Sequence, residues 1–476
     1  MNIIPNYNNN ICFLLLITII LFSTIKNELR IPFKTEKYMN IPLEISSEDD
    51  LSNYLLNIIY KNIYIELEIG EPTPQKIKSY LKLDDFPFFI QGKDIPSTQY
   101  DQTKSTTYKS ELYPHVFLDG EEEIKWGFVS NDTIKIENKS SNLNIKEFNF
   151  ILVTETRTQS PSNIGLMIPG QYSSIPEISF IHQLKNQELI EYYSFVLNYT
   201  SINKDEGEFI VGGAPHIYDY KYNIKYYNSE YGINKPKYMM YGLEFDLINY
   251  GNNQTNIGGS MQSKFLSDFG LIAGTKNYYE LILEKFFNDY INKEICYIKE
   301  IKLNIEWREG EKYFEYIYCD KNKVDISQLQ NIKFIHNRLN YTYEFNYKEL
   351  FDEIDNYYIF KIIFQKTSNF YWIFGKIWLE KYLMVFDQDQ KTIGYYYINE
   401  KEKVIIDNKK KNINVQLLIG LVFIVLILIG FTIWLIFYLK KDIRKKRINE
   451  INDDYEYKQD SFNKKNLINN ELGFDK

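Results

Sequence analysis

The sequence contains few cysteines and histidines and no excess of basic residues. Cysteine occurs three times and histidine four times in 476 residues, and no group of them has the spacing of a zinc site. The net charge of −8 excludes the clustered basic surface that nucleic-acid binding needs. We therefore expect no metal, no cofactor and no nucleic-acid partner.

Apolar residues are plentiful and are distributed in short runs. Hydrophobic residues make up 44% of the chain, which is enough for a large core. Between about Asn57 and Asn399, runs rich in Ile, Tyr, Phe and Val alternate with Gly, Asn and Pro, a pattern typical of strands and turns. Helical character is limited to brief stretches such as Ile178–Leu189 and Tyr278–Asn292. The fold class is therefore expected to be mostly β.

Two longer apolar runs lie outside this region. Ile11–Ile25 is too short to span a bilayer comfortably and is placed like a secretory signal peptide, the alternative being an uncleaved signal anchor. Leu417–Leu439 has 23 residues without a charge, enough for a transmembrane helix. Six basic residues follow this run and three precede it, which predicts a cytosolic C-terminus. We expect a single-pass type I membrane protein of the secretory pathway, at the cell surface or on an endomembrane.

Five Asn-x-Ser/Thr sequences lie on the side predicted to be lumenal, so a glycoprotein is expected. In a chain this rich in asparagine, some of these sequences arise by chance. They begin at Asn131, Asn138, Asn198, Asn253 and Asn340.

Cys296 and Cys319 are the only cysteines outside the leading apolar run. In an oxidising compartment they can close a short loop as a disulfide, and the alternative is two buried thiols. The residues alone leave both possibilities open.

The chain contains two similar loops, about 190 residues apart. They are Tyr80–Phe86 (YLKLDDF) and Phe265–Gly270 (FLSDFG), and each follows an apolar strand. An apolar segment with a glycine follows each loop downstream, at Ile164–Leu166 and Ile373–Gly375. A plan repeated in this way suggests two similar lobes.

Further segments, in the same order along the chain, resemble those of pepsin-family aspartic peptidases. They are Ile69–Gln75 (IGEPTPQ), Trp126–Ile136, Asn163–Gly170 (NIGLMIPG), Gly207–Asp219, Leu271–Phe286 and Trp372–Tyr396. The resemblance implies a bilobal pepsin-like fold with two β-barrel-like lobes and an interlobe cleft. It also implies a second-lobe disulfide between Cys296 and Cys319. Leu29–Phe33 (LRIPF) resembles the start of a propeptide, and the alternative is a remnant of the signal peptide.

The expected organisation combines this fold with the targeting and membrane segments. The tail is polar and mixed in charge, so we expect it to be disordered. The parts are a signal peptide (1–25), a propeptide-like segment (26–56), an N-terminal lobe (57–219), a C-terminal lobe (220–400), a stalk (401–416), a transmembrane helix (417–439) and a cytosolic tail (440–476).

The resemblance implies cleavage of peptide bonds by two aspartates, one from each lobe, in Asp-Thr-Gly and Asp-Ser/Thr-Gly loops. The two carboxylates share a proton, so that one activates water while the other protonates the carbonyl oxygen. Counting without gaps from the flanking motifs places Lys82 and Leu266 at these positions. A buried Lys82 is expected to have a lowered pKa or to pair with Asp84 or Asp268. No useful proteolysis is then expected.

A register shifted by two residues in both loops gives an alternative pair. Asp84 and Asp268 lie two residues past the expected positions, and a shift of two preserves the strand face. Asp268-Phe269-Gly270 is then a degenerate Asp-x-Gly, whereas Asp84 has no glycine where the tight loop needs one. The alternative hypothesis is an active peptidase that uses Asp84 and Asp268.

The family's Tyr-Gly-x-Gly flap hairpin corresponds to Phe117–Gly120, which an acidic segment follows. Phe117 lacks the hydroxyl group that the flap tyrosine contributes to the active-site hydrogen bonds. The alternative is a plain surface hairpin. Both interpretations weaken the case for catalysis.

These observations lead to three hypotheses. The leading one is a membrane-anchored, pepsin-like protein that has lost catalysis and binds a peptide or protein in its cleft. The second is an active aspartic endopeptidase of an acidic compartment. The third is a structural surface glycoprotein that makes no use of the cleft.

Overall fold

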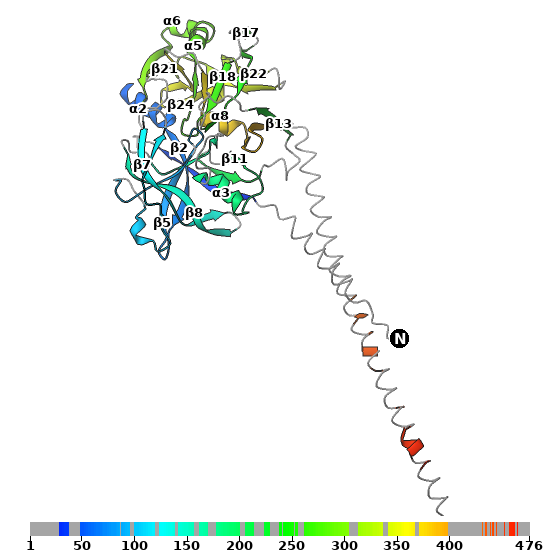
Figure 1. Ribbon diagram of the computed structural model, residues 1–476. Coiled ribbons are helices and arrows are strands. Elements are labelled where there is room, and N and C mark those ends of the chain that lie inside the picture. The colour runs from blue at the N-terminus through cyan, green and yellow to red at the C-terminus, as the bar shows by residue number, and fades with distance from the viewer. Residues whose placement is uncertain are drawn as a thin grey trace, which may run out of the picture. The chain divides into compact units, whose positions relative to one another are not determined.

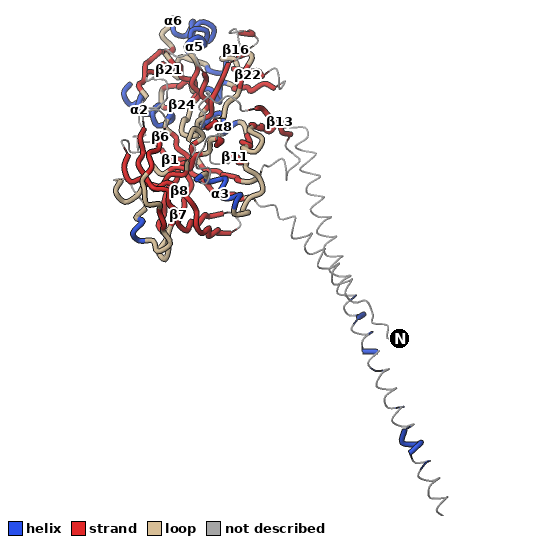
Figure 2. Tube along the Cα trace, viewed as in Figure 1, coloured by secondary structure: helices blue, strands red, loops and turns tan. Residues whose placement is uncertain are grey.

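The structure is a computed structural model in which strands predominate over helices, as the sequence predicts (Figure 2). It divides into two units, Met1–Tyr397 and Ile398–Lys476, and the sheets belong to the first. The described residues are 28–37, 48–85, 87–95, 100–119, 123–138, 141–156, 161–169, 178–199, 205–213, 223–228, 238–239, 241–251, 253–255, 261–303, 313–336, 341–366 and 371–397, with isolated positions between 431 and 464.

The first lobe is built on a 14-stranded sheet, in the order β13-β29-β28-β11-β12-β1-β2-β3-β9-β4-β8-β7-β5, with β6 paired to β7. Its elements are β1 (Leu29–Lys37), α2 (Glu48–Ile59), β2 (Lys61–Ile69), β3 (Gln75–Lys82), β4 (Phe88–Gln91), η1 (Gln102–Lys104), β5 (Lys109–Ser110), β6 (His115–Asp119), β7 (Glu123–Asn138), β8 (Ser141–Thr156), β9 (Asn163–Gly165), β10 (Ile168–Pro169), α3 (Phe180–Asn186), β11 (Ser194–Tyr199) and β12 (Glu206–Val211).

The second lobe contains a nine-stranded and a four-stranded sheet. Its elements are β15 (Glu244–Phe245), β16 (Leu247–Tyr250), β17 (Asn253–Thr255), β18 (Met261–Phe265), β19 (Ile272–Gly274), α5 (Lys276–Ile282), η3 (Leu283–Phe287), α6 (Asn288–Asn292), β20 (Cys296–Lys302), β21 (Tyr313–Asp320), η4 (Ile326–Gln328), β22 (Ile332–His336), β23 (Tyr341–Phe345), α7 (Tyr347–Leu350), β24 (Phe351–Ile354), β25 (Tyr357–Phe360), β26 (Ile362–Gln365), β27 (Tyr371–Phe374) and α8 (Lys376–Lys381).

Three strands from outside the first lobe's own sequence join its large sheet. They are β13 (Asn223–Asn228), β28 (Met384–Asp387) and β29 (Thr392–Tyr397), and β28 pairs with β11. A separate short pair joins β10 to β14 (Tyr238–Met239). Figure 1 shows β18, β21 and β22 grouped apart from β5, β7 and β8, with β11 between the two groups. The large sheet therefore receives β28 and β29 after the second lobe is complete.

Alternating apolar residues explain the strands that lead to the site. In β2, Ile63, Ile65, Leu67 and Ile69 are buried, which is the period of two expected for a strand with one face on the core. The second-lobe core depends more on aromatic rings, since Phe374 stacks on Trp378 with centroids 3.8 Å apart. Such packing supports the ends of β3 and β18, which lead into the two loops of the candidate site.

The N-terminal segment is an integral part of the fold. β1 lies between β12 and β2, so the LRIPF segment forms a strand of the large sheet. The next element, α2, was not expected from the sequence, and the expected boundary at residue 56 falls within it. Its residues Leu51, Leu55 and Ile58 follow helical spacing and are buried, a signal that was available in the sequence.

Other expectations can be compared directly with the structure. Cys296 and Cys319 form a disulfide between paired positions of β20 and β21, and helices occur in both expected stretches. No helix among the described residues is long and apolar enough to cross a membrane. Most of Leu417–Leu439 and all of the expected signal peptide lie outside the described residues, so membrane anchoring stays a prediction.

Candidate functional site

The first loop (Lys82–Asp85) follows β3 and is braced by the chain just after β9. The backbone N–H of Leu166 donates to the carbonyl of Lys82 at 2.8 Å, and that of Met167 donates to the carbonyl of Asp85, also at 2.8 Å. Lys82 itself pairs with Gly165 in the parallel register of β3 and β9. The apolar segment with a glycine that the sequence indicated therefore holds this loop through main-chain bonds.

The second loop (Leu266–Gly270) follows β18 and has an equivalent brace. The N–H of Leu266 donates to the carbonyl of Phe374 at 3.1 Å, and the N–H of Lys376 donates to the carbonyl of Phe269 at 2.6 Å. Between them, Gly375 has no room for a side chain, because a Cβ there would lie 1.9 Å from the carbonyl oxygen of Phe269. Each lobe therefore supports its loop with main-chain hydrogen bonds from the apolar segment that contains a glycine, as the repeat in the sequence predicts.

Ser267 joins the two loops across the lobes. Its hydroxyl donates to the carbonyl of Leu81 at 2.5 Å and accepts the backbone N–H of Leu83 at 3.1 Å. The serine is fully buried, so these bonds satisfy groups that water does not reach. Because the bonds are made to the residues on either side of Lys82, they place Lys82 directly opposite the second loop.

An ion pair completes the junction. Nζ of Lys82 donates to Oδ2 of Asp268 at 2.5 Å, and the two side chains are 25% and 24% exposed. The sequence left Asp84 and Asp268 open as partners for Lys82, and the structure pairs Lys82 with Asp268. In the alternative catalytic pair of Asp84 and Asp268, the carboxylate of Asp268 therefore already binds the ammonium group of Lys82.

Leu266 lies at the other position predicted for a catalytic aspartate. Its side chain is buried and belongs to an apolar cluster with Phe269, Leu271 and residues of α2. A hydrocarbon side chain neither donates nor accepts a proton. In the gap-free register, the second-lobe position therefore has no acid–base group.

Asp84 and Asp85 occupy the rest of the first loop. Asp84 is half-buried in the turn after β3, while Asp85 is buried and accepts a hydrogen bond from Nδ2 of Asn163 at 2.5 Å. Asp85 is therefore bound into the brace of its own lobe. Asp84 is the other member of the alternative pair.

Helix α2 is attached directly to the second loop. The N–H of Gly270 donates to the carbonyl of Ile59 at 2.7 Å, and Tyr60 forms an isolated β-bridge with Phe269. A Cβ on Gly270 would lie 1.7 Å from the carbonyl oxygen of Ile58. The N-terminal helix is therefore part of the support of the site.

Lys376 makes a further contact between α8 and the first lobe. Its side chain is 3% exposed, and Nζ lies 3.0 Å from Oδ1 of Asp205 and 3.1 Å from Oγ1 of Thr35 on β1. Burial lowers the pKa of Lys376, and nearby Lys61 lowers it further, whereas Glu380 and Asp205 oppose this shift.

The remaining sequence-predicted residues belong to strands outside the two loops or lie outside the described residues. Phe117 is in β6, paired with Lys125 of β7, and Gly120 lies outside the described residues. Of the glycosylation candidates, Asn131 and Asn138 are in β7, Asn198 is in β11 and Asn253 is in β17. Asn340 lies outside the described residues.

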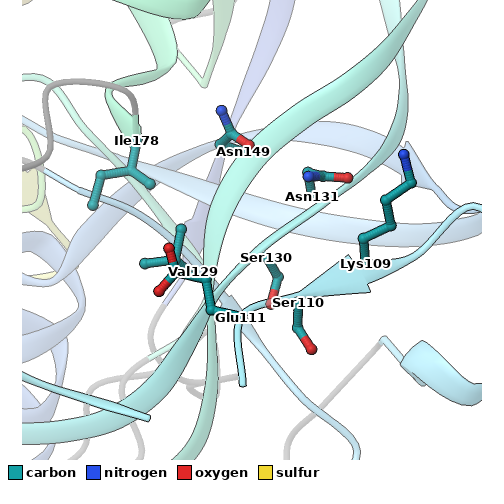
Figure 3. A pocket seen from close by; sticks show the side chains of 8 residues that line it. All are labelled: Lys109, Ser110, Glu111, Val129, Ser130, Asn131, Asn149 and Ile178. Carbon is teal, nitrogen blue, oxygen red and sulfur yellow. The ribbon is translucent and has the colours of Figure 1, made fainter. Parts of the chain in front are cut away.

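A cavity of about 280 Å³ opens on the first lobe, over β5, β7 and β8 (Figure 3). None of its lining residues comes from either loop, so it is separate from the candidate site. Within the described part of the chain, no group of three or more His, Cys, Asp and Glu residues could hold a metal ion. The lining residues are Lys109, Ser110, Glu111, Val129, Ser130, Asn131, Asn149 and Ile178.

Comparison with known families agrees with this architecture. A family model for eukaryotic aspartyl proteases matches residues 93–396, more than half of the 476-residue chain. The match includes the second loop and begins downstream of the first. No curated protein matches the chain. The chain belongs to the eukaryotic aspartyl protease family.

Proposed function

We propose that this protein is a non-catalytic member of the family that binds a peptide or protein between its lobes without cutting it. The observation that carries the proposal is the ion pair between Lys82 and Asp268, with 2.5 Å between Nζ and Oδ2. The pair lies where the two loops meet, at the place where a peptidase of this family needs two carboxylates sharing a proton.

The residues at this place do not suit the chemistry of peptide hydrolysis. A protonated Lys82 cannot take a proton from water, and Leu266 cannot deliver one to a carbonyl oxygen. General acid–base catalysis typically contributes 10²–10⁴-fold per group, so the loss of both groups removes most of the rate enhancement. Meanwhile, the braces and the Ser267 bonds preserve the arrangement of the loops. A site that keeps the arrangement of the two loops but lacks the acid–base groups favours peptide binding over peptide cleavage.

Catalysis by Asp84 and Asp268 would require a rearrangement. The two carboxylates would have to share a proton, but the carboxylate of Asp268 binds the ammonium of Lys82. Lys82 would first have to leave this site. The ion pair therefore supports the non-catalytic function over the alternative.

The proposed setting is the lumenal or outer side of a membrane of the secretory pathway. The Cys296–Cys319 disulfide supports an oxidising compartment, and the apolar run Leu417–Leu439 supplies the proposed anchor. Asn131, Asn138 and Asn198 are the proposed glycan acceptors in described strands of the first lobe. The ligand would then be a polypeptide of that compartment.

Peptide capture tests the proposal. The full-length chain, purified in mild detergent, is incubated at pH 7 with a pool of ten-residue peptides, washed and eluted, and the eluate is analysed by mass spectrometry. We expect saturable retention of intact peptides. Absence of retained peptides would instead favour a structural surface glycoprotein, and fragments in the eluate would support an active peptidase.

A further inference from the structure

We propose that the cavity on the first lobe binds the first sugar residue of an N-linked glycan attached to Asn131. This role requires the proposed lumenal setting, where such glycans are added to Asn-x-Ser/Thr sequences, but not the binding of a peptide between the lobes. The glycan would then be held against the folded protein, whereas a glycan without such a cavity extends freely into solvent.

Asn131 lies in the middle of the strands that form the cavity. In β7 it pairs with Lys109 of β5 on one side and with Asn149 of β8 on the other. All three residues line the cavity, and Figure 3 shows Asn131 between Lys109 and Asn149. Paired residues on neighbouring strands project from the same face of a sheet, so a sugar on Asn131 lies within reach of both neighbours.

The side-chain amide of Asn131 is placed for this attachment. Its Oδ1 is buried without a hydrogen-bond partner in the described part of the chain, whereas Nδ2 is not among such atoms. Nδ2 is the atom to which the sugar of an N-linked glycan is joined. Of the acceptor asparagines that the structure describes, Asn131 alone lines the cavity. The cavity therefore distinguishes Asn131 from Asn138, Asn198 and Asn253.

The lining has the two kinds of surface that a sugar ring requires. Val129 and Ile178 are apolar and belong to one hydrophobic cluster. The side-chain amide of Asn149 makes no hydrogen bond to the described residues, since the bonds between Asn149 and Gln183 use the main chain of Asn149. A sugar ring has C–H groups on its faces and hydroxyl groups around its edge. Its face can therefore cover the apolar residues while a hydroxyl group bonds to Asn149.

The size and charge of the cavity favour a single neutral sugar over other occupants. Its volume of about 280 Å³ is near the lower limit of small-molecule sites, which occupy about 300–1,000 Å³. Further sugars of the glycan would therefore extend into solvent. Nζ of Lys109 lies 2.8 Å from Oε1 of Glu147, and because this pairing neutralises the lysine, an anion such as phosphate is not favoured.

Protection of the glycan from enzymatic release tests the proposal. The full-length chain is produced in a eukaryotic secretory host, purified in mild detergent and treated with peptide N-glycosidase, with and without prior denaturation. Release converts the acceptor asparagine to aspartate, so mass spectrometry of peptides gives the rate at each site. We expect a glycan on Asn131 that is released about tenfold more slowly from the native than from the denatured protein, because the sugar must first break its hydrogen bonds in the cavity. Glycans on Asn138 and Asn198 should show a smaller difference.

Variants of the lining separate the cavity from the general effect of a folded strand. Asn149→Ala keeps the acceptor sequence of Asn131 and should remove most of the protection at that site. Asn142→Ala is the matched control, because Asn142 is exposed on the same strand and does not line the cavity, and thermal unfolding reports whether each variant is folded. Equal protection at Asn131 in wild type and Asn149→Ala would overturn the inference.

The occupancy of the acceptor sites gives a second way to overturn the inference. An Asn131 that carries no glycan while Asn138 or Asn198 does would contradict the role of the cavity and leave the proposed setting intact. A chain with no glycan at any site would contradict both the inference and the proposed lumenal setting. Neither result bears on peptide binding between the lobes, which the peptide-capture experiment tests separately.

Discussion

The two loops that meet between the lobes have the same main-chain support but different side chains. The first is braced through the carbonyls of Lys82 and Asp85, and the second through Leu266 and Phe269, in each case mainly by main-chain bonds. The second loop also keeps a bridging serine and a glycine, whereas the first has neither. Main-chain braces do not depend on side-chain identity, so the geometry of such a loop can survive the loss of its chemistry.

The glycine of the second loop gives the largest expected effect. In Gly270→Ala the new Cβ would lie 1.7 Å from the carbonyl oxygen of Ile58, and backbone cannot yield as a side chain does. We expect a loss of stability of about 4 kcal/mol or more, or failure to fold, measured by denaturant unfolding. Gly92→Ala is the control, since its new Cβ would lie 3.1 Å from its nearest neighbour, the carbonyl oxygen of Val153. Equal losses in both variants would contradict the role given to α2.

The serine between the loops comes next. Ser267→Ala leaves the N–H of Leu83 and the carbonyl of Leu81 without this partner, and each buried unsatisfied group costs about 1–3 kcal/mol. We expect an overall loss of about 2–4 kcal/mol in the free energy of unfolding. Ser79→Ala is a matched control, because Ser79 is fully buried and its hydroxyl has no hydrogen-bond partner within the described part of the chain. A similar loss in the control would show that the Ser267 bonds contribute little.

The ion pair is expected to contribute less to stability, because both side chains are partly exposed. Lys82→Met and Asp268→Asn should each lower the free energy of unfolding by about 1–2 kcal/mol, between the values for exposed and buried pairs. The charge-reversed double variant Lys82→Asp with Asp268→Lys should recover part of this loss. Additive losses in the double variant would show that the two side chains are not energetically coupled.

The smallest change in stability is expected from placing a glycine in the first loop. The backbone of Asp84 is not among the positive-φ positions of the described residues, so a glycine is not needed there. Asp84→Gly should lower stability by about 0.5–1 kcal/mol through backbone entropy and should produce no peptidase activity. A gain in stability would mean that the loop is strained by the aspartate.

Much of this arrangement could be predicted from the sequence. The short runs of Ile, Tyr, Phe and Val predicted the mostly β fold. Counting without gaps from the flanking motifs placed Lys82 and Leu266 in the two loops that the structure brings together. The pairing of Lys82 with Asp268 across the lobes was not predictable, because it depends on the bonds that Ser267 makes between the two loops. Helix α2 was missed even though its apolar spacing is helical, because the segment was interpreted as propeptide-like.

Peptide cleavage is the most direct test of the central claim, that the junction of the two loops is not catalytic. The full-length chain is assayed against a mixed peptide library between about pH 3 and 7, the range over which carboxylates titrate, with and without an inhibitor that mimics the transition state. We predict no inhibitor-sensitive cleavage at any pH. Inhibitor-sensitive cleavage that Asp268→Asn abolishes would contradict the account and establish Asp268 as a catalytic residue.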